Sequence, residues 1–235
     1  MPRLARIVIA GVANHIVQRG NNRQDVFFVD DDRAHYLALL REQARLHDLR
    51  ILAWCLMTNH VHLVAVPEKT DSLGRAVGRT DFLYTQYVNR LHGRSGHLWQ
   101  NRFHSCALDE KHFWTALRYV EQNPLRAGLV QDALAYPWSS AAAHVAGEDE
   151  RELIDMSQWT QIMAPSDWRR LLSRPPAKAE VKALRQCTHR GWPLAGDSAL
   201  AKFEKILGRR VRPLPNGRPR KPRTKEQRTT HVGPK

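Results

Sequence analysis

Residues 55–64 read Cys-Leu-Met-Thr-Asn-His-Val-His-Leu-Val, and from His60 as far as Val66 every side chain is apolar or an imidazole. A short run of this kind, rich in β-branched residues, predicts a strand. Alternate residues of a strand share a face, so we expect His60 and His62 to lie side by side. The preceding run, Arg50–Leu56, predicts a second strand that pairs with the first as a hairpin.

Two imidazoles on one face of a strand can bind a single divalent metal ion without a loop folding around it. A His-x-His pair is also common among ordinary surface or core histidines, and taken alone it favours that structural explanation. The chemical interpretation therefore depends on whether the rest of the chain supplies a further ligand and a reacting group.

Positive charge is distributed unevenly along the 235 residues. Lys and Arg outnumber Asp and Glu by 37 to 23, a net charge of +14, and such an excess favours a polyanionic partner, most often nucleic acid. Residues 208–235 hold ten Lys or Arg and one acid, so this tail carries +9 and the first 207 residues carry +5. The tail lacks the apolar face of a helix that lies on a membrane.

Cysteine use and hydropathy indicate the cellular compartment. Cys55, Cys106 and Cys187 are an odd and widely spaced set, which indicates reduced thiols and no disulfide framework. No apolar run is long enough to span a bilayer, and the N-terminus has no signal-peptide pattern. We therefore expect a cytoplasmic, nucleoid-associated protein with no membrane partner.

Hydrophobic periodicity predicts the element order β-α-β-β-α-β-α for the first half of the chain, which is an α+β fold with one antiparallel sheet and helices packed on it. Three domains are expected: a catalytic domain at 1–147, a helical C-terminal appendage at 148–207, and a basic tail at 208–235 that stays disordered until bound. The predicted strands are 15–19, 50–56, 61–66 and 103–108, and the predicted helices are 33–46, 72–91, 110–122, 156–163, 167–172, 178–189 and 198–207.

The predicted helix at 110–122 carries Tyr119, and Asn123 follows four residues later. Positions i and i+4 share a helical face, so a phenol and an amide oxygen would point the same way. If this helix crosses the strand of His60 and His62, Asn123 supplies a third metal ligand and Tyr119 faces the metal-bound group. An ordinary packed tyrosine is the structural alternative.

Such a group of side chains suits phosphodiester transesterification. A divalent ion held by imidazole and amide ligands keeps positions open for a phosphate oxygen, and it offsets the charge that grows on the phosphoryl oxygens. An aryl oxide is both a nucleophile and a usable leaving group, so a strand could be cut, held on the protein and rejoined without ATP. These ligands favour Mg²⁺ or Mn²⁺, because zinc would normally recruit more histidines or a thiolate.

Several motifs together resemble the single-tyrosine HUH transposases, the insertion-sequence-200-like transposases. Residues 56–63 resemble their metal-binding strand, and residues 118–130 resemble their tyrosine helix and the turn after it. The similarity covers residues 3–145 and, more loosely, 190–220. Three more motifs match the subgroup of REP-associated tyrosine transposases: Gly20-Asn21-Asn22-Arg23, Gly96-His97-Leu98-Trp99-Gln100 and Tyr136-Pro137-Trp138-Ser139-Ser140.

This resemblance implies a ferredoxin-like HUH nuclease domain. The implied activity is cleavage and rejoining of single-stranded DNA at hairpin-forming repetitive extragenic palindromes, through a 5′-phosphotyrosine intermediate. Tyr119 is then the nucleophile, and His60, His62 and Asn123 are the metal ligands. Thr58 stands where many relatives have proline, which we expect to alter the hairpin turn. The subgroup implies a monomer, although insertion-sequence relatives act as dimers and a dimer stays possible.

Contacts to DNA are expected from loops and strand ends. A hairpin ligand needs phosphate contacts for affinity and base contacts for specificity. An indole can stack on an unpaired base, although burial in the core is the structural alternative for Trp138. Proline-spaced arginines can enter a narrow groove, and a non-specific electrostatic role is the alternative for the tail. The residues predicted to contact DNA are Arg19, Arg23, Arg94, Arg102, Trp138, Arg218 and Arg220.

Two alternatives stay open. A rolling-circle-type HUH nickase would keep the fold without transposition, but such proteins usually have a longer histidine cluster or paired tyrosines. A domesticated, non-catalytic nucleic-acid-binding regulator would read the same repeats, but it would not need both histidines and Tyr119 together.

Overall fold

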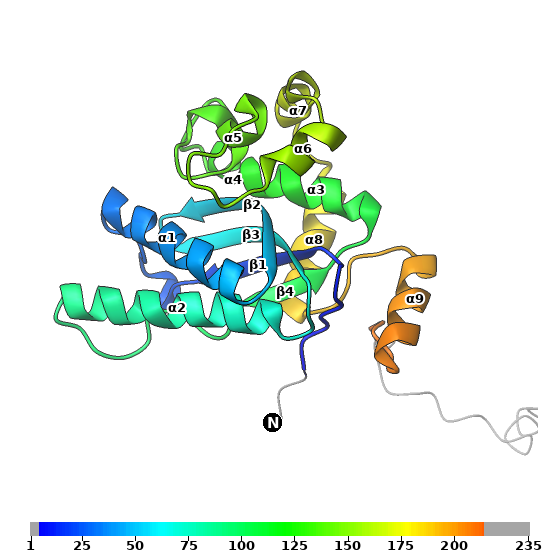
Figure 1. The fold of residues 1–235 in the computed structure, drawn as a ribbon, viewed down its shortest axis with the longest axis horizontal. Helices are drawn as coiled ribbons and strands as arrows, with labels where there is room; N and C mark the ends of the chain where they lie inside the picture. The colour runs from blue at the N-terminus through cyan, green and yellow to red at the C-terminus, as the bar shows by residue number, and fades with distance from the viewer. Residues whose placement is uncertain (1–4, 214–235) are drawn as a thin grey trace, which may run out of the picture.

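A computed structural model describes residues 5–213, and within that range four strands form one antiparallel sheet in the order β2-β3-β1-β4. The elements follow the chain order β1-α1-β2-β3-α2-β4-α3 (Figure 1), so the predicted α+β fold and its element order are confirmed. The strands are β1 (Asn14–Arg19), β2 (Leu49–Met57), β3 (His60–Pro67) and β4 (His104–Ala107).

Helices cover both faces of the sheet. Helices α1 (Asp30–Leu46) and α2 (Ser72–Leu91) pack on one face, against Ile16, Leu63 and Trp54. Helix α3 (Glu110–Glu121) packs on the other face, against Cys55 and Val64. Because side chains alternate along a strand, each strand contributes to both cores.

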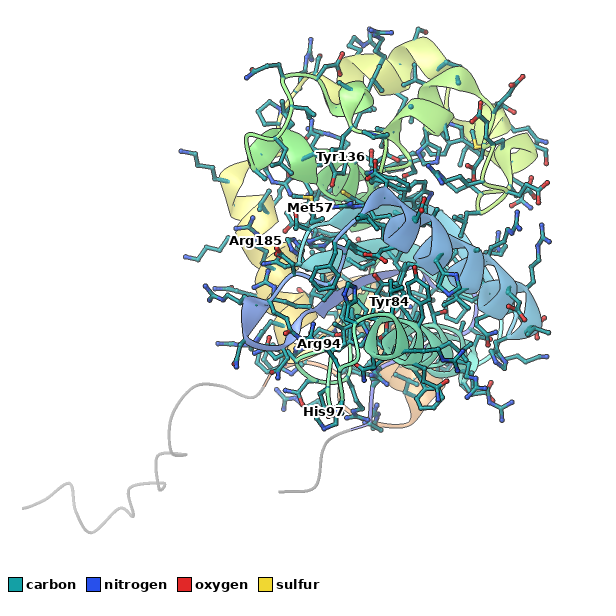
Figure 2. All side chains as sticks on the ribbon, turned by 90° about the vertical axis from the view of Figure 1, so that its left-hand side faces the viewer. Met57, Tyr84, Arg94, His97, Tyr136 and Arg185 are labelled. Atoms are coloured by element: carbon teal, nitrogen blue, oxygen red, sulfur yellow. The ribbon has the colours of Figure 1, made fainter. Side chains whose placement is uncertain are left out.

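Helix α8 (Lys178–Arg190) also packs on the α3 side of the sheet, across β4 and β1. In Figure 2, where the left-hand side of Figure 1 faces the viewer, Arg185 on α8 and Met57 at the end of β2 lie on the same side of the molecule. The division of the chain at residue 147 stays a prediction, but α8 shows that the C-terminal helices contact the sheet directly.

The other helices lie at the periphery. Helices α5, α6 and α7 group beyond β2, at the top of Figure 1, and Phe203 of α9, together with Val211 that follows the helix, packs with Ala107 of β4. None of the helices in the described part of the chain has the length and apolar character needed to cross a membrane. The remaining bounds are α4 (Asn123–Arg126), α5 (Ala141–Ala146), α6 (Met156–Ile162), α7 (Pro165–Leu172) and α9 (Asp197–Leu207), with 3₁₀ turns at Asn21–Arg23 and Ala133–Ala135.

The helix predicted at 110–122 ends one residue earlier than predicted, next to the site. The pattern predicted a single helix through residue 122 with Asn123 on its face, whereas α3 ends at Glu121 and Asn123 begins the short helix α4. Pro124 explains the break, because proline has no amide hydrogen and is best tolerated in the first turn of a helix.

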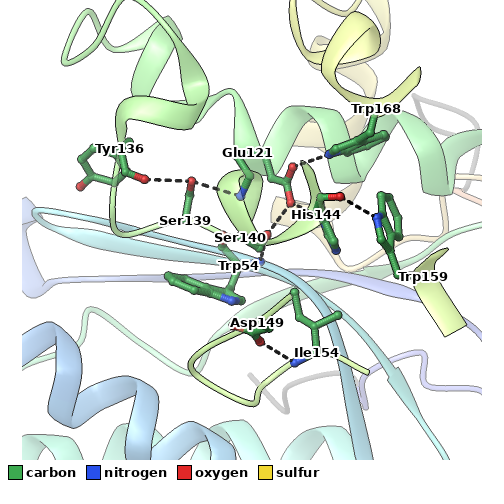
Figure 3. A network of polar contacts seen from close by, with 11 residues as sticks. Trp54, Glu121, Tyr136, Ser139, Ser140, His144, Asp149, Ile154, Trp159 and Trp168 are labelled. Carbon is green, nitrogen blue, oxygen red and sulfur yellow. Dashed lines mark hydrogen bonds and ion pairs between the residues drawn. The ribbon is translucent and has the colours of Figure 1, made fainter. Parts of the chain in front are cut away.

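A buried carboxylate fixes the end of α3 against the C-terminal helices (Figure 3). Glu121 is 0% exposed, and its Oε1 accepts a hydrogen bond from Ser140 Oγ and one from His144 Nδ1, both at 2.5 Å. Its Oε2 accepts a hydrogen bond from Trp168 Nε1 at 2.8 Å. The His144 ring stacks on Trp159 with centroids 3.8 Å apart. Since Ser140 precedes α5 and Trp168 belongs to α7, one carboxylate joins α3 to both.

On the opposite face, a second buried carboxyl group makes the stability of the fold depend on pH. Asp81 of α2 accepts hydrogen bonds from Gln18 Nε2 at 2.9 Å and from the Tyr36 hydroxyl at 3.3 Å. Burial raises the pKa of Asp81 to about 7. Its pKa in the unfolded chain is about 3.9, so the unfolded state loses this proton first. The contribution of Asp81 to stability is therefore highest below pH 4 and falls as the pH rises towards 7.

We expect the unfolding free energy of the wild type minus that of Asp81→Asn to fall between pH 4 and pH 7, by on the order of a few kcal/mol. Urea unfolding of both proteins at several pH values measures this difference, and it cancels the titration of every other group. Parallel pH profiles for the two proteins would contradict the assignment.

Candidate active site

The sheet face that α3 and α8 cover carries a cluster of three histidines, His15, His60 and His62, and on β4 it also carries His104, which stacks on His189 of α8. The strand register places His60 opposite Arg19, His62 opposite Val17, and His15 opposite Val64. Directly opposed residues share a face, so His15 joins the predicted pair. The rings of His60 and His62 lie side by side, as predicted, with centroids 4.9 Å apart and planes at 77°.

Each histidine of the predicted pair is held through its Nδ1 atom. His62 Nδ1 lies 3.2 Å from His15 Nε2, and His15 Nδ1 lies 2.8 Å from the Thr188 hydroxyl oxygen on α8. His60 Nδ1 lies 2.6 Å from Asn59 Oδ1. Within residues 5–213 neither His60 Nε2 nor His62 Nε2 has a hydrogen-bond partner, so both of these atoms are available to a ligand.

Burial and neighbouring positive charge keep these imidazoles neutral. Burial lowers the pKa of His60 to about 4, with Arg19 and Arg185 lowering it further, and it lowers the pKa of His15 to about 3. The pKa of His62 falls well below its ordinary value, first through burial and then through the other histidines and nearby arginines. A neutral imidazole is the form that binds a metal ion.

The histidine pair fits one divalent ion. An imidazole nitrogen lies about 2.1 Å from a bound ion, so two rings bound at a right angle have centroids roughly 4.6 Å apart, close to the observed 4.9 Å. In the part of the chain that the structure describes, no group of three or more His, Cys, Asp or Glu side chains could hold a metal ion. Further ligands would therefore be amide, water or substrate oxygens, which suits Mg²⁺ or Mn²⁺.

Helix α3 places Tyr119 against these histidines. The Tyr119 ring meets His15 and His62 edge-on, with centroids 5.5 Å apart in both pairs. Its hydroxyl oxygen accepts a hydrogen bond from Arg185 Nε at 3.0 Å, and the Arg126 guanidinium lies 4.0 Å above its ring. A guanidinium donor at this distance stabilises negative charge that develops on the oxygen.

The predicted third ligand, Asn123, follows Tyr119 closely in sequence, but its amide group is hydrogen-bonded to neighbouring residues. Asn123 Nδ2 donates a hydrogen bond to the Val120 carbonyl at 3.2 Å, and Asn123 Oδ1 accepts one from Arg126. An amide oxygen has a second lone pair, so this contact leaves one acceptor position on Asn123. Its role as a metal ligand stays a prediction.

The residues predicted to contact DNA fall into three groups. Arg19 is half-buried beside His60, whereas Arg23, Arg94 and Arg102 are exposed. Arg94 donates a hydrogen bond to Gln24 Oε1 at 2.9 Å, and in Figure 2 it lies on the side of the molecule that also shows Arg185. Arg218 and Arg220 lie outside the described residues.

Trp138 requires a correction. It was predicted to stack on an unpaired base, with core burial as the alternative, and the structure favours the alternative: only 9% of Trp138 is exposed, and its Nε1 donates a hydrogen bond to Asp30 Oδ1 at 2.9 Å. The ring packs in the core between the sheet and α1, with Arg151 stacked 4.6 Å from its centroid. The indole is therefore a structural residue that joins the 136–140 turn to the start of α1.

Four site residues were missed from the sequence: His15, Arg126, Arg185 and Thr188. His15 could have been found from the sequence, because it lies on the predicted strand 15–19 and shares a face with Arg19, four residues later. Arg185 and Thr188 had none, since they lie in a helix more than 60 residues after Tyr119. Together with Arg19, the two missed arginines surround the histidine pair with positive charge, which is an environment that favours a phosphate group.

Sequence comparisons with known proteins give matches to transposases. The family model described as "Transposase IS200 like" matches residues 9–123, a stretch that contains the three histidines, Tyr119 and Asn123. A protein from Haemophilus influenzae named "Putative REP-associated tyrosine transposase" is 24% identical over 132 residues, which cover 52% of this chain and 73% of the relative.

A solved structure of a REP-associated tyrosine transposase bound to a REP hairpin has a similar fold. The TM-score is 0.53 at 21% sequence identity, and the match covers 66% of this chain and 90% of that one. At this identity the similarity concerns the fold, and it extends the agreement beyond the residues that the family model matches.

Proposed function

We propose that the protein is an IS200-like transposase, as the match of residues 9–123 to that family model supports, and that it cleaves and rejoins single-stranded, hairpin-forming DNA. One observation carries this proposal above the others: Tyr119 and His62 come from separate elements and meet with ring centroids 5.5 Å apart. A phenol beside neutral imidazoles and arginines suits transfer of a phosphodiester.

In the proposed reaction the hydroxyl oxygen of Tyr119 attacks the phosphorus of one phosphodiester. The bond from Tyr119 to phosphorus forms as the bond from phosphorus to the 3′ oxygen breaks, which gives a 5′-phosphotyrosine and a strand that ends in a 3′-hydroxyl. The phenol proton passes to solvent, and the departing 3′ oxygen takes up a proton. In the reverse step a 3′-hydroxyl attacks the phosphotyrosine and frees Tyr119, so no ATP is needed.

The surrounding residues have separate roles in this proposal. His60, His62 and Asn123 would hold Mg²⁺ or Mn²⁺, which when bound polarises the phosphate. Arg185, whose Nε lies 3.0 Å from the Tyr119 oxygen, stabilises charge on that oxygen before attack.

The proposed substrate is a hairpin that resembles repetitive extragenic palindromes, because the similar solved protein is bound to a REP hairpin. The exposed guanidinium groups of Arg23, Arg94 and Arg102 supply phosphate contacts. Tyr119 and the histidines meet within a single chain, which supports the proposal that the monomer is the active form.

A single-stranded hairpin with a labelled 5′ flank tests this function. With Mn²⁺ or Mg²⁺ we expect cleavage, a protein–DNA adduct that survives denaturation, and joining of the held strand to a second oligonucleotide. Chelation with EDTA is expected to stop all three. Binding without cleavage in either metal would favour the non-catalytic regulator, and cleavage without joining would favour the nickase.

Substitution of both metal-binding histidines is expected to remove metal-dependent cleavage. The double variant His60→Ala/His62→Ala should cleave the hairpin roughly 10³-fold more slowly, because the charge on the phosphoryl oxygens is no longer offset. His47→Ala, at the end of α1 on the other face of the sheet, is the control and should retain wild-type rates. Rates are measured under single-turnover conditions, and a double variant with an unchanged metal response would refute the assignment.

A further inference from the structure

We propose that Thr188 and His15 are positioning residues of the metal site, because together they fix the tautomer of His62 that leaves its Nε2 free to bind the ion. This inference rests on the proposed function, since it concerns the same site. It adds a requirement for α8, which lies outside the residues that the family model matches.

The chain of hydrogen bonds starts at the Thr188 hydroxyl. Thr188 Oγ1 donates its one hydrogen to the Leu184 carbonyl at 2.8 Å, one helical turn earlier. The oxygen is then left with lone pairs only, so its other partners must donate to it. The Cys106 thiol at 3.2 Å is therefore one such donor, and the His15 ring is the other.

The position of the proton on His15 follows directly. His15 Nδ1 lies 2.8 Å from Thr188 Oγ1, and because this oxygen accepts, Nδ1 must carry the hydrogen. A neutral imidazole has one N–H and one lone pair, so His15 Nε2 carries the lone pair.

The same step then applies to His62. His62 Nδ1 lies 3.2 Å from His15 Nε2, and because that atom accepts, His62 Nδ1 must donate. The lone pair of His62 is therefore on Nε2, the atom without a partner among residues 5–213. Thr188 and His15, which do not bind the ion themselves, thus decide which nitrogen of His62 can bind a metal.

An independent arrangement does the same for His60. Asn59 Nδ2 donates a hydrogen bond to the Arg23 carbonyl at 3.0 Å, which turns Asn59 Oδ1 towards His60 Nδ1 at 2.6 Å. An amide oxygen only accepts, so His60 Nδ1 donates and His60 Nε2 keeps its lone pair. Both imidazoles therefore keep Nε2 free for a metal ion. The hydrogen bonds that fix His60 start at the Arg23 carbonyl in the turn after β1, and those that fix His62 start at Thr188 on α8.

Without the Thr188 oxygen, the positions of the hydrogens on His15 and His62 are no longer fixed. A His15 ring with its hydrogen on Nε2 would donate to His62 Nδ1, and the hydrogen of His62 would then occupy Nε2. That tautomer cannot bind a metal ion through Nε2. A variant without the hydroxyl therefore divides the protein between competent and blocked forms, which lowers the apparent metal affinity.

Metal titration of the full chain tests this inference. Mn²⁺ binding is measured by calorimetry, and the bound ion by electron paramagnetic resonance, for the wild type, Thr188→Val and Thr188→Ser. Thr188→Val should weaken Mn²⁺ binding 10- to 100-fold, and Thr188→Ser, which keeps the hydroxyl, should restore wild-type affinity.

Thr80→Val is the matched control. Thr80 is 0% exposed on α2 and makes the same hydrogen bond to the carbonyl four residues earlier, at 2.8 Å, but it forms no hydrogen bond with a histidine among the described residues. Its melting temperature should fall about as much as that of Thr188→Val, while its Mn²⁺ affinity should stay within about twofold of the wild type. Equal affinity of Thr188→Val and the wild type would overturn the inference.

Nitrogen NMR of ¹⁵N-histidine in the metal-free wild type gives a second test that needs no variant and no metal. The hydrogen of His15 and that of His62 are both expected on Nδ1, and a hydrogen on His15 Nε2 would overturn the inference. Failure of the wild type to bind Mn²⁺, with both hydrogens on Nδ1, would instead count against the metal site of the proposed function.

Discussion

Replacing Tyr119 by phenylalanine should abolish both strand cleavage and the covalent protein–DNA adduct, a loss of roughly 10⁴-fold or more. Phenylalanine lacks the oxygen that bonds to phosphorus, so no 5′-phosphotyrosine can form. The ring contacts with His15, His62 and Arg126 would persist, so the fold and hairpin affinity should change little. Denaturing gels of a labelled hairpin measure the adduct, and gel shifts measure binding.

Tyr136→Phe is the control for that experiment. The hydroxyl of Tyr136 donates a hydrogen bond to the Leu56 carbonyl at 2.8 Å, and this ring takes no part in the proposed chemistry. Its variant should cleave within about threefold of the wild-type rate. An adduct that persists in Tyr119→Phe and disappears in Tyr136→Phe would show that Tyr119 is not the nucleophile.

Glu121→Ala is expected to give the largest loss of stability, about 3–5 kcal/mol of unfolding free energy. The substitution removes the acceptor of His144 and Trp168 inside the core, and it leaves the Ser140 hydroxyl with only its longer contact to the Trp54 carbonyl at 3.3 Å. It also frees the end of α3, two residues from Tyr119, so strand cleavage should fall as well. Urea unfolding followed by tryptophan fluorescence measures the loss.

Two further variants make that measurement interpretable. Glu121→Gln keeps one accepting oxygen and should lose less than Glu121→Ala, because a donor amide replaces only the other oxygen. Glu42→Ala, at an exposed position of α1, should stay within about 0.5 kcal/mol of the wild type. A loss below about 1 kcal/mol for Glu121→Ala would mean that water replaces the carboxylate at no great cost.

Local patterns were sufficient for most of the fold. The helix predicted at 72–91 is α2 with the same ends, Ser72 and Leu91, because its apolar stripe is long and regular. The alternation of residues 60–66 also placed His60 and His62 on one face. Each of these predictions depends only on residues that are neighbours in sequence.

Predictions that depend on distant segments were incomplete. Burial of Trp138 needed the position of α1, whose Asp30 accepts the indole hydrogen bond. The outcome there was decided by packing that a local pattern does not contain.

The site itself shows the same limit. The histidine pair and Tyr119 were identified from their own segments, but the hydrogen bonds that orient them come from Thr188 and Arg185. No spacing rule relates a helix near residue 188 to a strand near residue 62. Only the packing of α8 across β4 and β1 brings them together.

The placement of α8 also determines when the proposed site is completed during synthesis. A ribosome releases the chain from its N-terminus, so the strands and Tyr119 emerge well before Arg185 and Thr188. Until α8 has left the exit tunnel, Tyr119 lacks its hydrogen bond from Arg185, and His15 and His62 lack the hydroxyl that orders them. On the proposed function, an unfinished chain would therefore bind the metal ion less tightly than the complete protein.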